Sequence, residues 1–266
     1  MKKTVLILIV SVALLCMCFG IASAGPDMDR ILEKGELVVA MTGTQPPLNV
    51  TAKDGTIIGF DADVAKAISL NMGVKLTIST MPFAELLPAL ENGKVDMVIS
   101  SMTMTLERNR AVAFVGPYYV SGKGILTRAA NIAALQEADG LNEPAFRVAA
   151  LKDSTSMAFA QKAAPKASLV AIRSYDKAIE MLLGEKIDAL IADFPYCAFA
   201  AFRNKDKGLV AGQAKLTYEP LGIAVREDAL LINWLENFMM MLQGSGQLEA
   251  LTKRWFQDGS WIKELP

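Results

Sequence analysis

Residues 59–119, GFDADVAKAISLNMGVKLTISTMPFAELLPALENGKVDMVISSMTMTLERNRAVAFVGPYY, decide the fold of this chain. Residues 61–73 carry apolar side chains at helical spacing, with the leading aspartate as the expected N-cap, and a second helix is predicted at 83–91. Short apolar strands are predicted at 74–79 and 95–99. Helices that alternate with buried strands in this way indicate an α/β sheet.

The second half of the chain repeats this order of elements. A strand is predicted at 146–151, followed by the polar loop KDSTS (152–156) and a helix at 157–163. Further strands are predicted at 169–172 and 187–191. Small molecules bind beyond the carboxyl ends of the strands in open α/β sheets. We therefore expect two α/β lobes, with a ligand at the polar loops that follow their strands.

The polar loop with the clearest chemistry is ISSMTMTLER, residues 99–108. Ser100, Ser101 and Thr103 come directly after a buried strand, so the sheet would fix the positions of their donors. Arg108 follows on a short predicted helix, and its planar guanidinium can donate two parallel hydrogen bonds to a carboxylate. The loop is a candidate site for a small carboxylate. Spacing alone also allows a surface loop with an exposed arginine.

Residues 1–24 have the pattern of a secretory signal peptide. Two lysines precede an apolar run at 5–19, and the small residues ASA follow it. The run is shorter than the ~20 residues that span a bilayer, which disfavours a permanent membrane anchor. Lipid attachment to Cys16 or Cys18 is a further alternative, disfavoured because neither cysteine follows a small residue. We expect cleavage after Ala24.

Composition excludes several kinds of active site. The chain contains no histidine, which excludes Ser-His-Asp and Cys-His catalysis and His-ligated metal sites. We expect no metal and no cofactor. Without residues 1–24 the chain has 25 basic and 28 acidic residues, a formal charge of −3, which argues against nucleic-acid binding. Cys197 lies in the apolar run FPYCAFAAF and is expected to be buried packing rather than a nucleophile.

The chain resembles the periplasmic solute-binding proteins of polar amino acid ABC transporters, the bacterial extracellular solute-binding protein family 3. The matching pieces are GFDADVAKAI, FAELLPALENGKVDMVISSMTMTLERNRAVAFVGPYY, LKDSTS, KIDALIAD, PLGIAVRED and LTKRWF. They cover essentially all of the chain after the signal peptide, in the family's order. The resemblance implies a two-lobed periplasmic-binding-protein fold of type II, with the ligand in the cleft between the lobes.

The resemblance also implies lobe boundaries and a motion. Lobe I would comprise residues 25–120 and 221–266, and lobe II residues 121–220. The lobes would close on the ligand about two hinge strands near 120–123 and 217–221. Because ligand contacts from both lobes exist only in the closed form, the ligand would shift the population toward it.

The matching positions suggest roles for the polar residues of the first lobe. Arg108 would hold the α-carboxylate of an amino acid bidentately, and Thr103 would add its hydroxyl and amide. Ser101 would accept from the α-ammonium or donate from its backbone, and Ser100 would line the pocket beside it. Phe83 would form an aromatic wall; its alternative role is ordinary core packing.

The second lobe would complete the grip. Asp193 in LIAD would bind the α-ammonium, although a helix N-cap before FPYCAFAAF is an alternative. Thr155 and Ser156 would close over the carboxylate with backbone donors.

Four positions bear on ligand choice because they depart from the family pattern or match a side-chain contact. Gln45 and Leu48 stand where the first loop usually carries aromatics, in a pattern like YPPF, and Thr42 stands where binders of cationic or amide side chains often carry an acid. A strongly cationic side chain is therefore disfavoured, since its charge would lack a partner. Lys152 matches a side-chain contact of glutamine binders, so Gln45 and Lys152 together would suit a polar or acidic side chain.

The function implied is that of a monomeric periplasmic receptor that delivers an amino acid, or a related small carboxylate, to the membrane permease of an ABC importer. One alternative is a cyclohexadienyl dehydratase-like lyase on the same fold. It would need an acid such as Glu85 or Asp193 to protonate a leaving group. Another alternative is a soluble sensory subunit that feeds a receptor kinase. The sequence does not specify which amino acid is bound.

Overall fold

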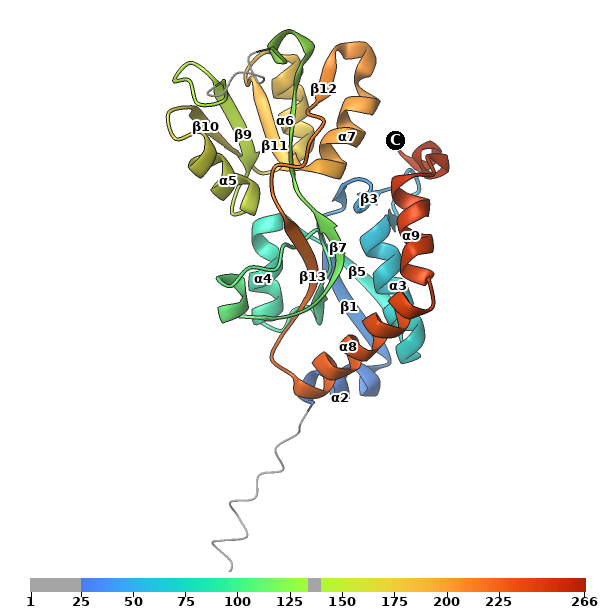
Figure 1. The fold of residues 1–266 in the computed structure, drawn as a ribbon. Coiled ribbons are helices and arrows are strands. Elements are labelled where there is room, and N and C mark those ends of the chain that lie inside the picture. Colours follow the sequence, from blue (N-terminus) through green and yellow to red (C-terminus); the bar gives the residue numbers. More distant parts are fainter. Residues whose placement is uncertain (1–24, 134–139) are drawn as a thin grey trace, which may run out of the picture.

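Two five-stranded sheets lie one above the other and are joined by crossing strands (Figure 1). The computed structural model describes residues 25–133 and 140–266, so the predicted signal peptide lies outside the described residues. None of the described helices is both long enough and apolar enough to cross a membrane.

The first sheet combines parallel and antiparallel strands. Its strands, in spatial order, are β5 (Lys75–Thr80), β1 (Glu36–Met41), β6 (Met97–Val98), β13 (Glu219–Val225) and β7 (Ala113–Ser121). β1 is parallel to β5 and β6, and β13 is antiparallel to β6 and β7. The apolar run LVVAM suits β1 because helices cover both faces of such a sheet. These helices are α2 (Pro26–Lys34), α3 (Phe60–Met72), α4 (Phe83–Glu91), α8 (Ala229–Gly244) and α9 (Gln247–Phe256).

The second sheet repeats this plan. Its strands, in spatial order, are β10 (Ser168–Ile172), β9 (Arg147–Leu151), β11 (Ala189–Asp193), β8 (Lys123–Arg128) and β12 (Leu209–Ala211). β9 is parallel to β10 and β11, whereas β8 is antiparallel to β11 and β12. The helices that pack on it are α5 (Thr155–Ala163), α6 (Tyr175–Leu183) and α7 (Phe194–Arg203). The predicted succession of strands and helices is confirmed in both halves.

Two local expectations were wrong. Residues 42–50, expected to be a loop, contribute β2 (Thr44–Gln45) and β3 (Asn49–Thr51), which form a small antiparallel sheet with β4 (Ile57–Ile58), within the strand predicted at 56–60. Asp61 is not the N-cap of α3, because Gly59 occupies that position and the helix begins at Phe60. The Asp61 carboxylate is instead fully buried and accepts hydrogen bonds from other parts of the chain.

The buried core is shared between the sheets. One apolar cluster joins Phe83 and Leu86 of α4 to Tyr175 of α6 and Leu190 of β11. Cys197 belongs to the same cluster and is fully buried, which confirms its expected role in packing. Apolar contacts therefore hold α4 of the first sheet against elements of the second.

The two connections between the sheets meet at Gly122. This residue lies between β7 and β8, and a Cβ built on it would come within 2.4 Å of the Thr217 carbonyl oxygen. Thr217 lies on the return connection, between β12 and β13. The backbones of the two connections are thus in direct contact there. The lobe boundaries near 120 and 220 remain a prediction.

Replacing Gly122 by alanine is expected to lower the free energy of unfolding by about 1–3 kcal/mol, because the new methyl group forces a backbone shift. Urea denaturation measures this change. Gly212→Ala is the matched control: its Cβ would meet nothing nearer than the Ile125 carbonyl oxygen at 3.8 Å. Its effect should stay within about 0.5 kcal/mol. Equal losses in the two variants would contradict close backbone contact at the crossing.

Candidate functional site

Arg108 begins a short 3₁₀ helix (Arg108–Arg110), which stands in place of the predicted helical segment. Its Nη1 donates to the Thr103 carbonyl oxygen at 2.8 Å, and its Cζ lies 5.6 Å from the centroid of the Phe83 ring. A guanidinium has five N–H donors, so this bond orients the group and leaves other donors available for a ligand. Burial lowers the pKa of Arg108, and the charges of Glu219 and Asp193 oppose that shift.

Ser101 follows the buried strand in a left-handed conformation, with φ of 51°. Its backbone N–H donates to Asp61 Oδ2 at 2.9 Å, so this amide is already engaged. Its buried hydroxyl oxygen has no hydrogen-bond partner among the described residues. A buried polar atom of this kind requires an explanation, and a ligand contact supplies one. Ser100 differs, because its fully buried hydroxyl accepts from the Thr42 N–H at 3.0 Å and supports the adjacent loop.

Asp61 organises this side of the site, a role that the sequence did not reveal. Its carboxylate accepts from Asn49 Nδ2 at 2.7 Å and from the Tyr118 hydroxyl at 2.9 Å, in addition to the Ser101 amide. Burial raises the pKa of Asp61 to about 6, and the three hydrogen bonds oppose the shift. The carboxylate joins β3, β7 and the Ser101 loop.

The N-terminus of α5 faces Thr103 from the second sheet. The Ser154 hydroxyl caps this helix by accepting from the Met157 N–H at 3.2 Å, so Thr155 and Ser156 occupy its first turn. First-turn N–H groups have no partner within the helix and favour anions. Thr103 Oγ1 and Thr155 Oγ1 lie 3.3 Å apart. The two halves of the predicted carboxylate site thus lie close together.

Asp193 occupies the N-cap position of α7, but its side chain makes no capping hydrogen bond. Its Oδ1 instead accepts from Lys123 Nζ at 2.8 Å. Lys123 Nζ also lies 3.5 Å from Glu219 Oε2, which accepts from the Thr103 hydroxyl at 2.8 Å. Sequence reasoning missed Lys123 and Glu219. The sequence feature that could have indicated Lys123 is its position between two glycines at the start of an apolar strand.

The residues expected to select the ligand side chain are not all in one place. The Thr42 hydroxyl lies 2.8 Å from Asn49 Oδ1 and 3.2 Å from Gln45 Oε1. Gln45 is buried and contacts Tyr175 of α6, whereas Leu48 belongs to the apolar core.

Lys152 stands apart from this group. Its side chain is 53% exposed and lies 4.0 Å from the Asp153 carboxylate. It lines a cavity of about 230 Å³ together with Phe83, Glu85 and Arg173. Phe83 is buried core, and its ring also lies 5.6 Å from the Arg108 Cζ; its role as an aromatic wall for the ligand remains a prediction.

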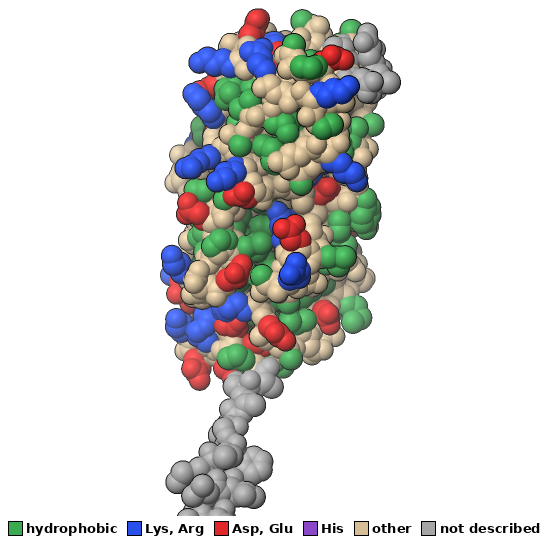
Figure 2. All heavy atoms as spheres, turned by 90° about the vertical axis from the view of Figure 1, so that its left-hand side faces the viewer, with side chains coloured by type: hydrophobic (Ala, Val, Ile, Leu, Met, Phe, Trp, Pro, Cys, Tyr) green, Lys and Arg blue, Asp and Glu red, His purple; other side chains and the backbone are tan. Residues whose placement is uncertain are grey.

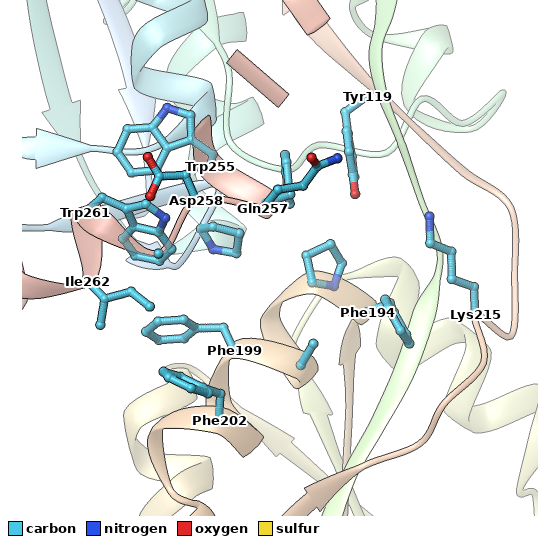
Figure 3. Close-up of a pocket in the computed structure, with 15 residues that line it drawn as sticks. Tyr119, Phe194, Phe199, Phe202, Lys215, Trp255, Gln257, Asp258, Trp261 and Ile262 are labelled. Carbon is cyan, nitrogen blue, oxygen red and sulfur yellow. The ribbon is translucent and has the colours of Figure 1, made fainter. Parts of the chain in front are cut away.

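A separate cavity of about 390 Å³ lies between α7 and the C-terminal segment (Figure 3). Phe199 of α7 stacks on Trp261 with ring centroids 5.4 Å apart, and Tyr119 stacks on Phe256 at 4.5 Å. Many of its lining residues are aromatic, and they include Phe194 and Pro195, which follow Asp193, but neither Asp193 itself nor Arg108. This cavity is thus distinct from the predicted carboxylate site.

Two further kinds of site find no support in the part of the chain that the structure describes. That part contains no cluster of three or more acidic or cysteine side chains able to hold a metal ion. Basic and acidic side chains are interspersed on the face shown in Figure 2, which lacks the basic stripe typical of a nucleic-acid surface.

Sequence comparison finds a family profile and individual relatives that match most of this chain. The profile of the bacterial extracellular solute-binding proteins, family 3, matches residues 37–258. The L-cystine-binding protein TcyJ of Escherichia coli is 25% identical over 234 residues, which cover 86% of this chain and 85% of that protein. A cyclohexadienyl dehydratase of Pseudomonas aeruginosa is 23% identical over 230 residues, 86% of each chain.

Solved structures agree with these sequence similarities. The binding component of an ABC transporter from Wolinella succinogenes, complexed with lysine, superposes with a TM-score of 0.82 at 31% identity. The match covers 86% of this chain and 99% of that chain. The two-lobed, type II periplasmic-binding-protein fold is thereby confirmed.

Proposed function

The chain belongs to the bacterial extracellular solute-binding proteins, family 3, and on that premise we propose that it captures an amino acid between its lobes and delivers it to an ABC importer. One observation carries the proposal. Arg108 and the unpartnered Ser101 hydroxyl come from the first lobe, and the N-terminus of α5 and Asp193 come from the second. The 3.3 Å approach of Thr103 to Thr155 brings these halves together.

The proposed grip assigns each end of the amino acid to a different partner. The α-carboxylate binds the guanidinium of Arg108 and the first-turn amides of Thr155 and Ser156. The α-ammonium binds Asp193, whose Oδ1 holds Lys123, and donates to the Ser101 hydroxyl. The Ser101 amide takes no part, because Asp61 already accepts from it.

We infer that the protein binds its ligand without converting it, although one relative is named a cyclohexadienyl dehydratase. A lyase of that kind needs a protonated acid beside the leaving group. Asp193 Oδ1 is already engaged in an ion pair with the Lys123 ammonium at 2.8 Å. Glu85, the other candidate acid, shares its cavity with Lys152 and Arg173. Turnover of prephenate or arogenate would contradict this inference.

The location and partners proposed follow from the same role. Cleavage of residues 1–24 releases a monomer into the periplasm, where the closed, loaded form docks on a membrane permease. Nucleic acid is not among its partners.

A thermal-shift screen against the twenty amino acids tests the function. A ligand that binds only the folded state raises the melting temperature. At a ligand concentration of 100 times the Kd, the free energy of unfolding rises by about 2.7 kcal/mol. We expect a clear rise with one or a few amino acids. No rise with any of them, at concentrations up to about 10 mM, would contradict amino-acid capture.

Closure of the lobes is a second expected result. Ligand contacts from both lobes favour the closed form, so the radius of gyration should fall when the binding amino acid is added. Small-angle X-ray scattering with and without saturating ligand measures this change. A non-binding amino acid from the thermal-shift screen is the control, and identical scattering curves in all cases would contradict ligand-driven closure.

A further inference from the structure

Lys123 is the least expected charged residue in the site. It lies at the start of β8, and its side chain is only 2% exposed. Its ammonium is 2.8 Å from Asp193 Oδ1 and 3.5 Å from Glu219 Oε2. A fully buried lysine is retained only where acids compensate its charge, and these two carboxylates do so.

These ion pairs neutralise the acids that face the bound ligand. Glu219 is further engaged, because it accepts from the Thr103 hydroxyl at 2.8 Å and from the Thr217 hydroxyl at 3.0 Å. Asp193 and Glu219 balance Lys123 and Arg108 in charge. A zwitterionic amino acid, which carries one charge of each sign, leaves this balance unchanged. A ligand with an additional cation does not.

The other described acids near the site are exposed, engaged or paired with cations. Glu107, whose charge also acts on Arg108, is exposed. The loop TGTQPPLNV, residues 42–50, contains no acid. Asp61 is committed to three hydrogen bonds within the protein. Glu85 shares its cavity with the cations Lys152 and Arg173.

We propose that Lys123 takes the place of a ligand cation, so that the site selects net-neutral or acidic amino acids against arginine and lysine. This inference rests on the proposed capture of an amino acid and names the class that is captured. Because Lys123 already pairs with Asp193 and Glu219, the charge of a cationic ligand side chain, added to that of the α-ammonium, would be buried without a carboxylate to compensate it. The relative from Wolinella succinogenes, solved with lysine, provides the contrast.

Calorimetry with arginine and citrulline tests the proposal, because citrulline has nearly the same shape and no side-chain charge. The parent protein should bind citrulline at least 10-fold more tightly than arginine, or bind neither. Lys123→Gln leaves one carboxylate in excess and should raise the affinity for arginine at least 10-fold relative to citrulline. The double variant K123Q/E219Q restores the charge balance, so its preference should match that of the parent.

A second variant, which changes the charge of the site in the opposite direction, tests the proposal even if K123Q does not fold. Glu219→Gln retains an acceptor for Thr103 and leaves one cation in excess, so it should shift the preference from glutamine toward glutamate by at least 10-fold. Arginine binding by the parent as tight as citrulline binding would overturn the proposal. So would the absence of arginine binding by folded K123Q, or an unshifted preference in E219Q. A parent that binds no amino acid at all would instead overturn the function on which the inference rests.

Discussion

Replacing Arg108 by alanine is expected to weaken binding of the amino acid by about 10²- to 10³-fold. The guanidinium is proposed to hold the α-carboxylate in a partly buried position, where removal of one partner of a charge pair costs about 2–5 kcal/mol. Isothermal titration calorimetry with the amino acid found by thermal shift measures the loss. Affinity equal to that of the parent would exclude Arg108 from the carboxylate site.

The same short helix provides the matched control. Arg110 is exposed and lies two residues further on, so Arg110→Ala removes an equal charge without removing a ligand contact. Its affinity should stay within about twofold of the parent value, since long-range charge effects at exposed sites are screened by salt. Equal losses in both variants would indicate a general effect of net charge.

Arg108→Lys separates charge from geometry. A lysine keeps the positive charge but loses the planar fork that matches a carboxylate, so binding should fall between the values for the parent and the alanine variant. The lysine variant should also lose the contact that the guanidinium makes over the Phe83 ring.

The sequence predicted Arg108 and its loop because the information is local. A buried strand, two serines, a threonine and an arginine within ten residues specify a polar loop at a sheet edge, and the order of strands and helices gives the α/β class. Thr155 and Ser156 were instead indicated by the family resemblance: the sequence placed them in a loop, whereas they occupy the first turn of α5 behind the capping Ser154.

The charged network could not be predicted in this way. Lys123 and Asp193 are 70 residues apart, and Thr103 and Glu219 are 116 apart. The first contact depends on the antiparallel pairing of β8 with β11, and the second on the return of β13 beside Thr103. No short-range pattern specifies either. The N-cap prediction for Asp61 was wrong for a related reason. An aspartate at the start of a helical pattern is a preferred N-cap, but its partners Asn49, Ser101 and Tyr118 lie 12, 40 and 57 residues away.

Asp61→Asn is expected to destabilise the fold by about 1–3 kcal/mol at neutral pH. The asparagine amide places donors against the N–H and O–H donors of Asn49, Ser101 and Tyr118, which leaves buried groups unsatisfied. Urea denaturation measures the loss. Asp206→Asn, at an exposed site, is the control and should change stability by less than about 0.5 kcal/mol.

The pH dependence of this loss tests the assignment further. Burial raises the folded-state pKa of Asp61 from 3.8 to about 6, so between these values the folded state binds more protons than the unfolded state. Stability from this group is therefore present at low pH and is lost as the pH rises through about 6. Asparagine does not titrate, so the gap between parent and variant should widen by roughly 1.4 kcal/mol from about pH 7.5 to about pH 5. A gap that is constant, or that narrows at the lower pH, would show that the Asp61 carboxylate keeps an ordinary pKa despite its burial.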